Sequence, residues 1–273
     1  MNELQLTKLG FTLELTQRAY LPQFIGNTIR GALGRALDDN SREVYDAVFK
    51  VVEGESVPNP FVISAPYPCK DKYRAGKIVK YRAGESVEYK AGERLEFFIT
   101  LFGSACAYDK DIVDAASLMC RGKLAGAVLF DVRCEYSRTW SDSNADTIPF
   151  CDALMIEFIT PTELLSSKQP VYEPDFSAFI DSLLGRISAI IDNYGENEFI
   201  IPYSLIARKP KVSAKYELEQ ILIHSNSHPI SGFIGGIDYF GDVTRYLPYI
   251  DLGSQLHLGK KTTRSCGEYV FSI

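Results

Sequence analysis

Paired cysteines and long apolar runs are both missing from this sequence. Its six cysteines stand singly, with no Cys-x-x-Cys pair: Cys69, Cys106, Cys120, Cys134, Cys151 and Cys266. Isolated cysteines predict free thiols in a reduced, cytoplasmic protein. No apolar stretch approaches the roughly 18–20 residues that span a bilayer. Residues 1–5 do not begin a basic patch followed by an apolar stretch, so we expect no signal peptide.

The sequence also lacks the common catalytic motifs and an excess of positive charge. It contains no P-loop, no Gly-x-Ser-x-Gly turn and no His-Glu-x-x-His motif. With 35 acidic against 29 basic residues, the formal net charge is −6, which argues against nucleic-acid binding through bulk charge. Basic residues outnumber acidic ones between positions 69 and 94, so a local patch is compatible with the acidic total. We expect neither a metal nor a cofactor.

What is present is a chain of 273 residues, 46% hydrophobic, which is enough for two domains of ordinary size. Alternating apolar residues predict strands, and apolar residues spaced by three or four predict helices. In the first half these patterns predict strands at 9–15, 61–63, 95–102 and 128–132, and helices from 26, over 43–51 and over 109–119. In the second half they predict strands at 151–159, 218–224, 232–240 and 268–273, and helices at 176–194 and 243–252.

Each half therefore has the order β-α-β-β-α-β. This order predicts an α+β protein with two tandem ferredoxin-like domains, each an antiparallel sheet of four strands with two helices on one face. We place the N-terminal domain at 1–140, with a basic insert at about 69–94 that we expect to be a long hairpin or mobile loop. A polar link precedes the C-terminal domain at 148–273.

A glycine-punctuated, basic loop precedes the last strand. Its notable residues are Gly253, Gly259, Lys260, Lys261, Thr262, Thr263, Arg264 and Gly267. Glycines allow the backbone to approach a phosphate, cations neutralise it, and hydroxyl groups bond to it. A solvated loop between a helix and a strand has the same composition. Composition alone therefore leaves a phosphate-backbone site and an ordinary loop equally open.

The three histidines all lie in the last third of the chain. His257 comes just before the basic loop, and its near-neutral pKa suits proton transfer, although packing at the end of an element is the structural alternative. His224 and His228 are four residues apart but in a strand or hairpin context without a third ligand. Surface positions or contacts with nucleic acid fit these two residues better than a metal pair does.

Several stretches occur in an order typical of one family. They are residues 24–37, 45–49, 58–63, 92–97, 101–103, 158–161, 232–241 and the loop Leu256-His257-Leu258-Gly259-Lys260-Lys261-Thr262-Thr263. Together they resemble the CRISPR-associated repeat-processing endoribonucleases of the RAMP superfamily, which cut precursor CRISPR RNA. The resemblance extends over nearly the whole chain. It differs at Ser265, where the family loop usually has a glycine.

The resemblance implies tandem ferredoxin-like domains and a metal-independent endoribonuclease. In that reaction a 2′-hydroxyl attacks the adjacent phosphate and leaves a cyclic phosphate and a 5′-hydroxyl. The chemistry needs a base, a cation for the pentacoordinate charge and an acid for the leaving oxygen. At the matching positions, the resemblance implies catalytic roles for His257 in proton transfer, for Tyr45, and for Arg30 in charge stabilisation.

The expected partner is CRISPR repeat or guide RNA, with other CRISPR effector subunits as further partners. We expect RNA contacts from Lys260, Lys261, Arg264, Thr262, His224, His228 and Arg35. The alternative is a RAMP subunit that binds guide RNA in an effector complex without cutting it.

Overall fold

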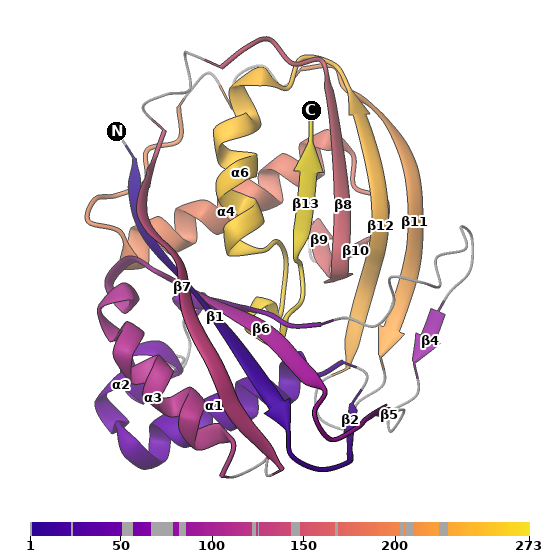
Figure 1. Ribbon diagram of the computed structural model, residues 1–273. Coiled ribbons are helices and arrows are strands. Elements are labelled where there is room, and N and C mark those ends of the chain that lie inside the picture. Colours follow the sequence, from indigo (N-terminus) through magenta and orange to yellow (C-terminus); the bar gives the residue numbers. More distant parts are fainter. Residues whose placement is uncertain are drawn as a thin grey trace.

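Two sheets, one built mainly from each half of the chain, form the framework of the molecule (Figure 1). The computed structural model describes residues 2–22, 24–50, 57–66, 79–81, 86–121, 124, 126–142, 148–166, 169–202, 205, 210–223 and 229–273. None of its described helices is long and apolar enough to cross a membrane.

The first sheet has the strand order β3-β6-β1-β7. Its strands are β1 (Glu3–Leu15), β3 (Phe61–Ser64), β6 (Arg94–Phe102) and β7 (Ala127–Ser141). Helices α1 (Gly26–Asn40), α2 (Arg42–Val48) and α3 (Asp109–Met119) accompany it. Phe11 of β1 lies opposite Phe97 of β6, and both are buried with Ile29 and Leu33 of α1. The predicted apolar stripe of this helix is therefore the face that packs on the sheet.

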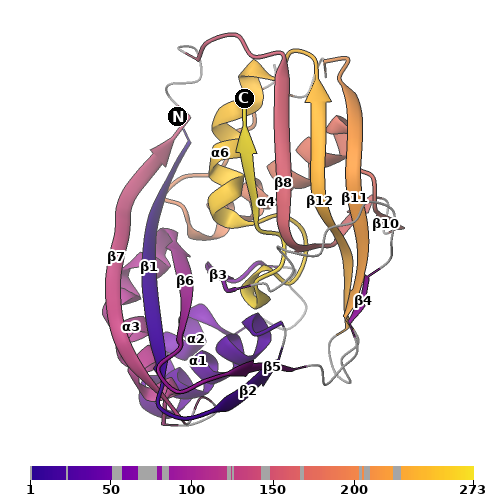
Figure 2. The ribbon, with the colours of Figure 1, turned by 45° about the vertical axis from the view of Figure 1, so that its right-hand side comes forward.

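The second sheet has the order β13-β8-β12-β11-β4. Its strands are β8 (Ala153–Thr162), β11 (Ser213–Ile223), β12 (Ile230–Phe240), β13 (Tyr269–Ser272) and the short β4 (Val79–Tyr81). Helices α4 (Phe176–Tyr194) and α6 (Leu247–Leu256) accompany this sheet, and Figure 2 shows α6 beside β13 and α4 behind β8 and β12. Asp175 caps α4 by accepting a hydrogen bond from the Ala178 N–H, and Phe158 and Phe179 meet in the core edge to face.

The predicted pair of ferredoxin-like folds is confirmed. In both halves, setting β4 aside, the spatial order runs fourth, first, third and second strand of the β-α-β-β-α-β unit, and all pairings among these strands are antiparallel. Helices α3 and α4 have the predicted bounds. Strand β8 extends through Pro161, where we expected it to end, because its pairing with β13 stops at Phe158 and the proline breaks no bond to that strand.

The basic insert forms two short strands whose pairing partners its sequence did not predict. Strand β4 pairs in parallel with β11, with Val79 opposite Ile221, so a piece of the predicted N-terminal domain lies in the second sheet. Strand β5 (Ser86–Tyr89) pairs with β2 (Ala19–Pro22). A further small pair is formed by β9 (Leu164–Ser166) and β10 (Gln169–Val171). Residues 69–78 and 82–85 of the insert, like most of the polar link, lie outside the described residues.

The two halves share a core. Leu4, Leu6, Val62 and Phe102 from the first half are buried in the same cluster as the second sheet and its helices. Hydrogen bonds cross as well: the Tyr194 hydroxyl donates to the Pro58 carbonyl at 2.7 Å. The Trp140 indole N–H donates to the Pro248 carbonyl at 3.3 Å. The arrangement of the halves is thus set by packing as well as by connection.

One prediction concerns Gly103, the first residue of the 3-10 helix η2 (Gly103–Tyr108), which touches the end of α4. Its φ is +59°, and an added Cβ would lie 1.9 Å from the Tyr194 carbonyl oxygen. We expect Gly103→Ala to lower the free energy of unfolding by about 2 kcal/mol or more. The matched control is Gly185→Ala in α4, where an added Cβ meets nothing within 4 Å. This substitution should stabilise the protein by roughly 0.5–1 kcal/mol. Equal effects in denaturant titrations would contradict the described contact.

Candidate functional site

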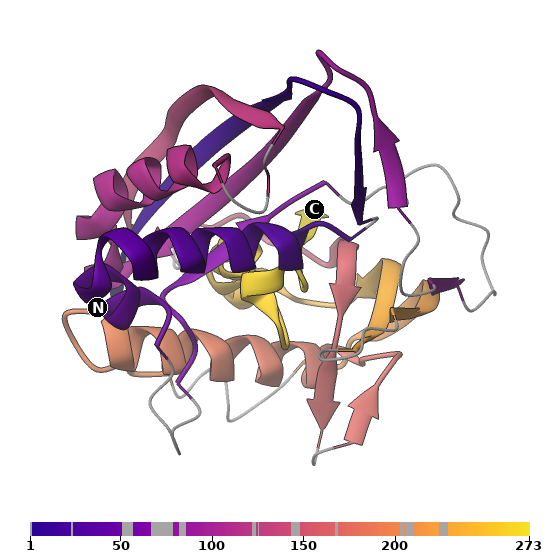
Figure 3. The same ribbon diagram turned by 90° about the horizontal axis from the view of Figure 1, so that it is seen from below.

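The C-terminal loop, defined here as residues 257–267, is a tightly folded segment between α6 and β13. Figure 3 shows it between α1 and α4. Three of its residues, His257, Lys261 and Ser265, are the only non-glycine residues with positive φ in the described chain, and Gly259 and Gly267 share that sign. Non-glycine residues occupy this backbone region at a cost and persist there only when their surroundings fix them. The loop is therefore held by specific contacts.

The loop glycines are required for packing against protein, and their approach to a phosphate stays a prediction. A Cβ at Gly259 would lie 2.4 Å from the Glu163 carbonyl oxygen, and one at Gly267 would lie 1.8 Å from that of Leu258. Gly253 lies within α6, where a Cβ would collide with Leu183 at 2.2 Å. Each position is closed to a side chain by neighbouring protein atoms.

Arg186 of α4 is the central contact of the loop, and the sequence analysis missed it. Its guanidinium donates to the carbonyl oxygens of Leu256 and His257, at 2.7 Å in each case for the shortest bond, and to the Thr262 hydroxyl at 2.9 Å. Two of these acceptors lie where α6 ends, so the cation also meets the negative end of that helix. Burial lowers the pKa of Arg186 to about 10, which leaves it charged at neutral pH. The sequence contains one indication of this role, because Arg186 is an isolated charge between the apolar helix positions Leu183 and Ile187.

Arg30 reaches the same loop from the first half. Its Nε donates to the Thr263 hydroxyl at 3.0 Å, and its guanidinium lies 5.4 Å from the centre of the Phe49 ring. Burial and then the charge of Arg264 lower the pKa of Arg30. The Tyr45 ring stacks on the same Phe49 ring, with 5.8 Å between the two ring centres. Arg30 thus connects the loop with the Phe49–Tyr45 ring pair, and the catalytic roles of Arg30 and Tyr45 stay predictions.

Four cations line one pocket of about 310 Å³ between α1, residues 57–59 and the loop. They are Arg30, Arg186, Lys261 and Arg264, accompanied by Thr262 and Thr263. No described acidic residue lines this pocket, although Lys261 pairs with Glu163 at its edge. Like charges so close repel one another unless an anion joins them, and arginine forks match the oxygens of a phosphate. We call this feature the cation pocket.

His257 does not fit the proton-transfer role that its sequence position suggested. It is 2% exposed, Nε2 lies 3.1 Å from the Ser64 hydroxyl and Nδ1 lies 3.2 Å from the Cys266 carbonyl oxygen. Since a carbonyl only accepts, Nδ1 carries the proton and Nε2 accepts from Ser64. Burial, and then the charge of Arg186, lowers the His257 pKa to about 3. The ring is neutral, fully bonded and outside the cation pocket, as in the structural alternative.

Ser265 occupies the position where the resembled family usually has glycine, and it keeps a glycine-like backbone, with φ +68° and ψ 25°. Its hydroxyl accepts a hydrogen bond from the Ala65 N–H at 2.9 Å, directly after β3. At Gly26 the first half comes equally close, since a Cβ there would lie 2.4 Å from the Arg264 carbonyl oxygen. The serine therefore ties the loop to the first half instead of loosening it.

The remaining predicted contact residues are dispersed. Lys260 is exposed and does not line the cation pocket, although its N–H donates to the Glu163 carbonyl at 3.2 Å. Arg35 lines a different pocket of about 220 Å³, between α1 and the end of α3. His224 and His228 lie outside the described residues. RNA contacts by these four residues stay predictions.

Comparisons with known proteins cover most of the chain. Residues 156–269 match the family model of the CRISPR-associated endoribonuclease Cas6, and residues 4–146 match the model AF_1859_N, an N-terminal domain. None of the curated proteins matches the sequence.

Solved structures show the same fold at low sequence identity. Thermus thermophilus Cas6 is 14% identical, with a TM-score of 0.62 over 98% of this chain and 99% of that one. A Cas6 product complex is 17% identical, with a TM-score of 0.55 over 98% and 100%. A chain of a partial Cas6-RT-Cas1–Cas2 complex is 10% identical, with a TM-score of 0.66 over 98% of this chain and 46% of that one.

The burial of His257 predicts a pH dependence of stability. Its folded pKa of about 3 lies below its ordinary value of 6.5, so the unfolded chain binds the extra proton as the pH falls. The contribution of neutral His257 to the free energy of unfolding is complete above pH ~6.5. It decreases by about 1.4 kcal/mol per pH unit between that value and pH ~3. We expect denaturant titrations of His257→Gln to show a shallower loss over this range than wild type. Parallel curves would mean that His257 titrates normally.

A second prediction separates the two properties of Ser265. Both Ser265→Ala and Ser265→Gly leave the buried Ala65 N–H without its acceptor, which costs about 1–3 kcal/mol. Glycine, however, also removes the cost of about 1–2 kcal/mol of the left-handed backbone. The alanine variant should therefore unfold at lower denaturant than both the glycine variant and wild type. An alanine variant as stable as wild type would show that the hydroxyl contributes nothing.

Proposed function

We propose that the chain, which matches an AF_1859_N domain followed by a Cas6 endoribonuclease domain, is a CRISPR-associated RNA-cleaving enzyme that processes precursor CRISPR RNA. It cuts within the repeats by metal-independent attack of a ribose 2′-hydroxyl. The observation that supports this mechanism most is the cation pocket in an otherwise acidic chain. Its four cations come from both halves and converge on a volume that suits a phosphate.

In the proposed reaction the 2′-oxygen loses its proton and attacks the adjacent phosphorus. The bond to the 5′-oxygen breaks, that oxygen takes up a proton, and a 2′,3′-cyclic phosphate and a 5′-hydroxyl result. Negative charge builds up on the phosphoryl oxygens in the pentacoordinate state. Fixed cations aimed at that charge are the largest single source of catalysis in such sites.

We assign charge stabilisation to Arg30, which Thr263 and Phe49 hold in place. Arg264 and Lys261 line the same pocket and are assigned to binding the RNA backbone. Arg186 positions the loop through its three acceptors and adds its charge to the pocket. Thr262 and Thr263 accept from arginines, so their own hydroxyl hydrogens remain available to phosphate oxygens.

Proton transfer is assigned to the Tyr45 hydroxyl. The ring is half-buried, stacked on Phe49 and 5.1 Å from the Arg42 guanidinium. It does not line the cation pocket, but it shares the neighbour Phe49 with Arg30, which does. His257, neutral and enclosed, is assigned to positioning the loop. This assignment gives proton transfer to a tyrosine instead of the histidine.

The proposed substrate is the repeat of a CRISPR transcript. Similar solved structures are Cas6 complexes with a product and with a substrate mimic, and one is a RAMP protein binding different RNA substrates. Another Cas6 occurs with reverse transcriptase, Cas1 and Cas2. By analogy we propose repeat RNA as the principal partner, and other CRISPR proteins as further ones.

The test is single-turnover cleavage of the repeat RNA in EDTA. We expect Arg30→Ala and Tyr45→Phe each to lower the rate by about 100-fold or more, while His257→Gln stays within a few-fold. Lys211→Ala, at an exposed position away from the cation pocket, serves as the charge-matched control for Arg30→Ala.

Three outcomes would revise the proposal. A requirement for added metal would exclude the mechanism, and an unchanged rate in Tyr45→Phe would remove that hydroxyl from proton transfer. Tight repeat binding without any product would favour the non-catalytic RAMP subunit.

A further inference from the structure

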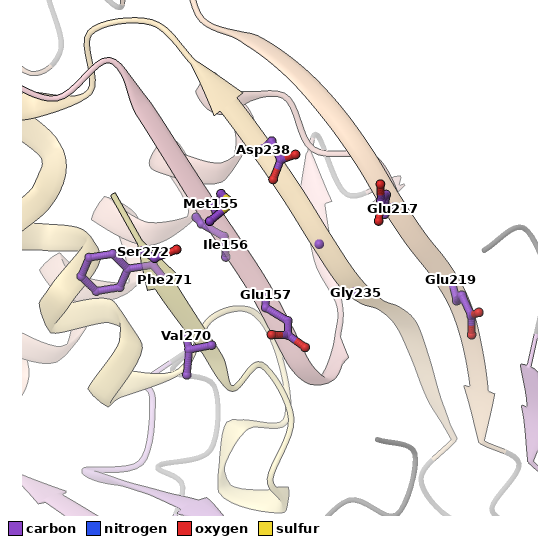
Figure 4. Close-up of a pocket in the computed structure, with 11 residues that line it drawn as sticks. Met155, Ile156, Glu157, Glu217, Glu219, Gly235, Asp238, Val270, Phe271 and Ser272 are labelled. Atoms are coloured by element: carbon purple, nitrogen blue, oxygen red, sulfur yellow. The ribbon is translucent and has the colours of Figure 1, made fainter. Parts of the chain in front are cut away.

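The second sheet has an open face opposite the one covered by α4 and α6. Its strands bury alternate residues against the helices, and the other residues point away from them. Figure 4 shows this open face, with side chains from β8, β11, β12 and β13. It lies outside the cation pocket and takes no part in the proposed reaction.

A notch crosses this face at Gly236. In the sheet register Gly236 stands between Glu157 of β8 and Glu217 of β11. A Cβ at Gly236 would meet nothing within 4 Å, so the glycine leaves a floor between two carboxylates. The surrounding pocket has a volume of about 620 Å³. That volume admits one large side chain and the backbone on either side of it.

Negative charge dominates the notch. Glu157, Glu217, Glu219 and Asp238 line it, and no described lysine or arginine does. Lys215 lies outside the lining and pairs with Glu217 at 3.0 Å and with Asp238 at 4.0 Å, so one positive charge faces two of the four carboxylates. A nucleic-acid backbone is repelled by such a surface, and a cationic ligand is attracted to it.

The Glu219 carboxylate lacks a hydrogen-bond donor within the described part of the chain. It is only 4% exposed, and neither carboxylate oxygen has a hydrogen-bond partner. A carboxylate removed from water without a donor is costly, and such a group is normally paired. In Figure 4 its side chain projects from β11 beside the notch.

The rim of the notch is apolar. Met155 of β8, opposite Asp238, is 55% exposed. Val270 of β13, opposite Glu157, is 48% exposed. No three His, Cys, Asp or Glu side chains are grouped to hold a metal ion in the described part of the chain. Arginine combines the required features: a forked cation with five donors on an aliphatic stem.

We infer that the acidic notch (Glu157, Glu217, Glu219 and Asp238) is a docking site for a basic segment of a protein partner. An arginine of the partner enters over Gly236, its guanidinium bonds to the carboxylates, and its stem packs on Met155 and Val270. The inference does not rest on the proposed function, because the notch shares no residue with the cation pocket.

The probe is a fluorescein-labelled peptide carrying two arginines and a leucine, measured by fluorescence anisotropy with the full chain. The same peptide with citrulline in place of arginine keeps the shape and loses the charge. The notch variant is Glu157→Gln, Glu217→Gln and Glu219→Gln combined. The control variant removes the same charge at exposed positions elsewhere, by Asp114→Asn, Glu196→Gln and Glu198→Gln.

We expect the arginine peptide to bind the notch variant at least about tenfold more weakly than wild type, and the control variant to change by less than twofold. The citrulline peptide should bind none of them. Equal losses in both variants would reduce the effect to net charge and overturn the proposal. A notch variant that loses repeat-RNA affinity, at constant peptide affinity, would make this face an RNA surface instead.

Glu219→Gln alone supplies an independent measurement. Because the free carboxylate lacks a donor, its removal should raise the thermal midpoint of the unbound protein while weakening peptide binding. A lowered midpoint would show that Glu219 already has a partner within the chain, and the site would lose its main support.

Discussion

The guanidinium of Arg186 is the contact on which the candidate site depends. A charge removed from water needs acceptors, and it finds them in the carbonyl oxygens at the end of α6 and in Thr262. The C-terminal loop must therefore turn back over α4 as soon as α6 ends, which places His257 and Ser265 in backbone conformations that they would otherwise avoid. The loop's shape follows from satisfying one buried cation.

That loop in turn joins the two halves. Ser265 bonds to Ala65, and His257 to Ser64, so the end of β3 and the loop fix each other. Arg30 then reaches Thr263 from α1. The cation pocket consists of residues from both halves, so its geometry exists only when the two ferredoxin-like units are packed together. The candidate site therefore changes shape whenever either unit moves relative to the other.

The fold was largely predictable, and the site only in part. Helix α4 follows from an uninterrupted apolar period, and the strand order follows from a β-α-β-β-α-β pattern repeated once. Sequence position placed His257 beside the loop but said nothing of its burial, so the sequence favoured a role in proton transfer that its 2% exposure does not fit. The role of Arg186 depends on carbonyl groups about seventy residues away. Strand β4, three residues within a basic insert, has no periodicity to reveal its pairing.

Strand β4 also affects how the protein is made. It leaves the ribosome well before its partner β11, and at roughly 5–20 residues per second that delay is on the order of ten seconds. Throughout this time the nascent chain carries a short strand with unpaired backbone groups, and the first sheet is complete only after β7 has been made. The time needed to synthesise residues 82–223 therefore sets how long β4 waits for its partner strand.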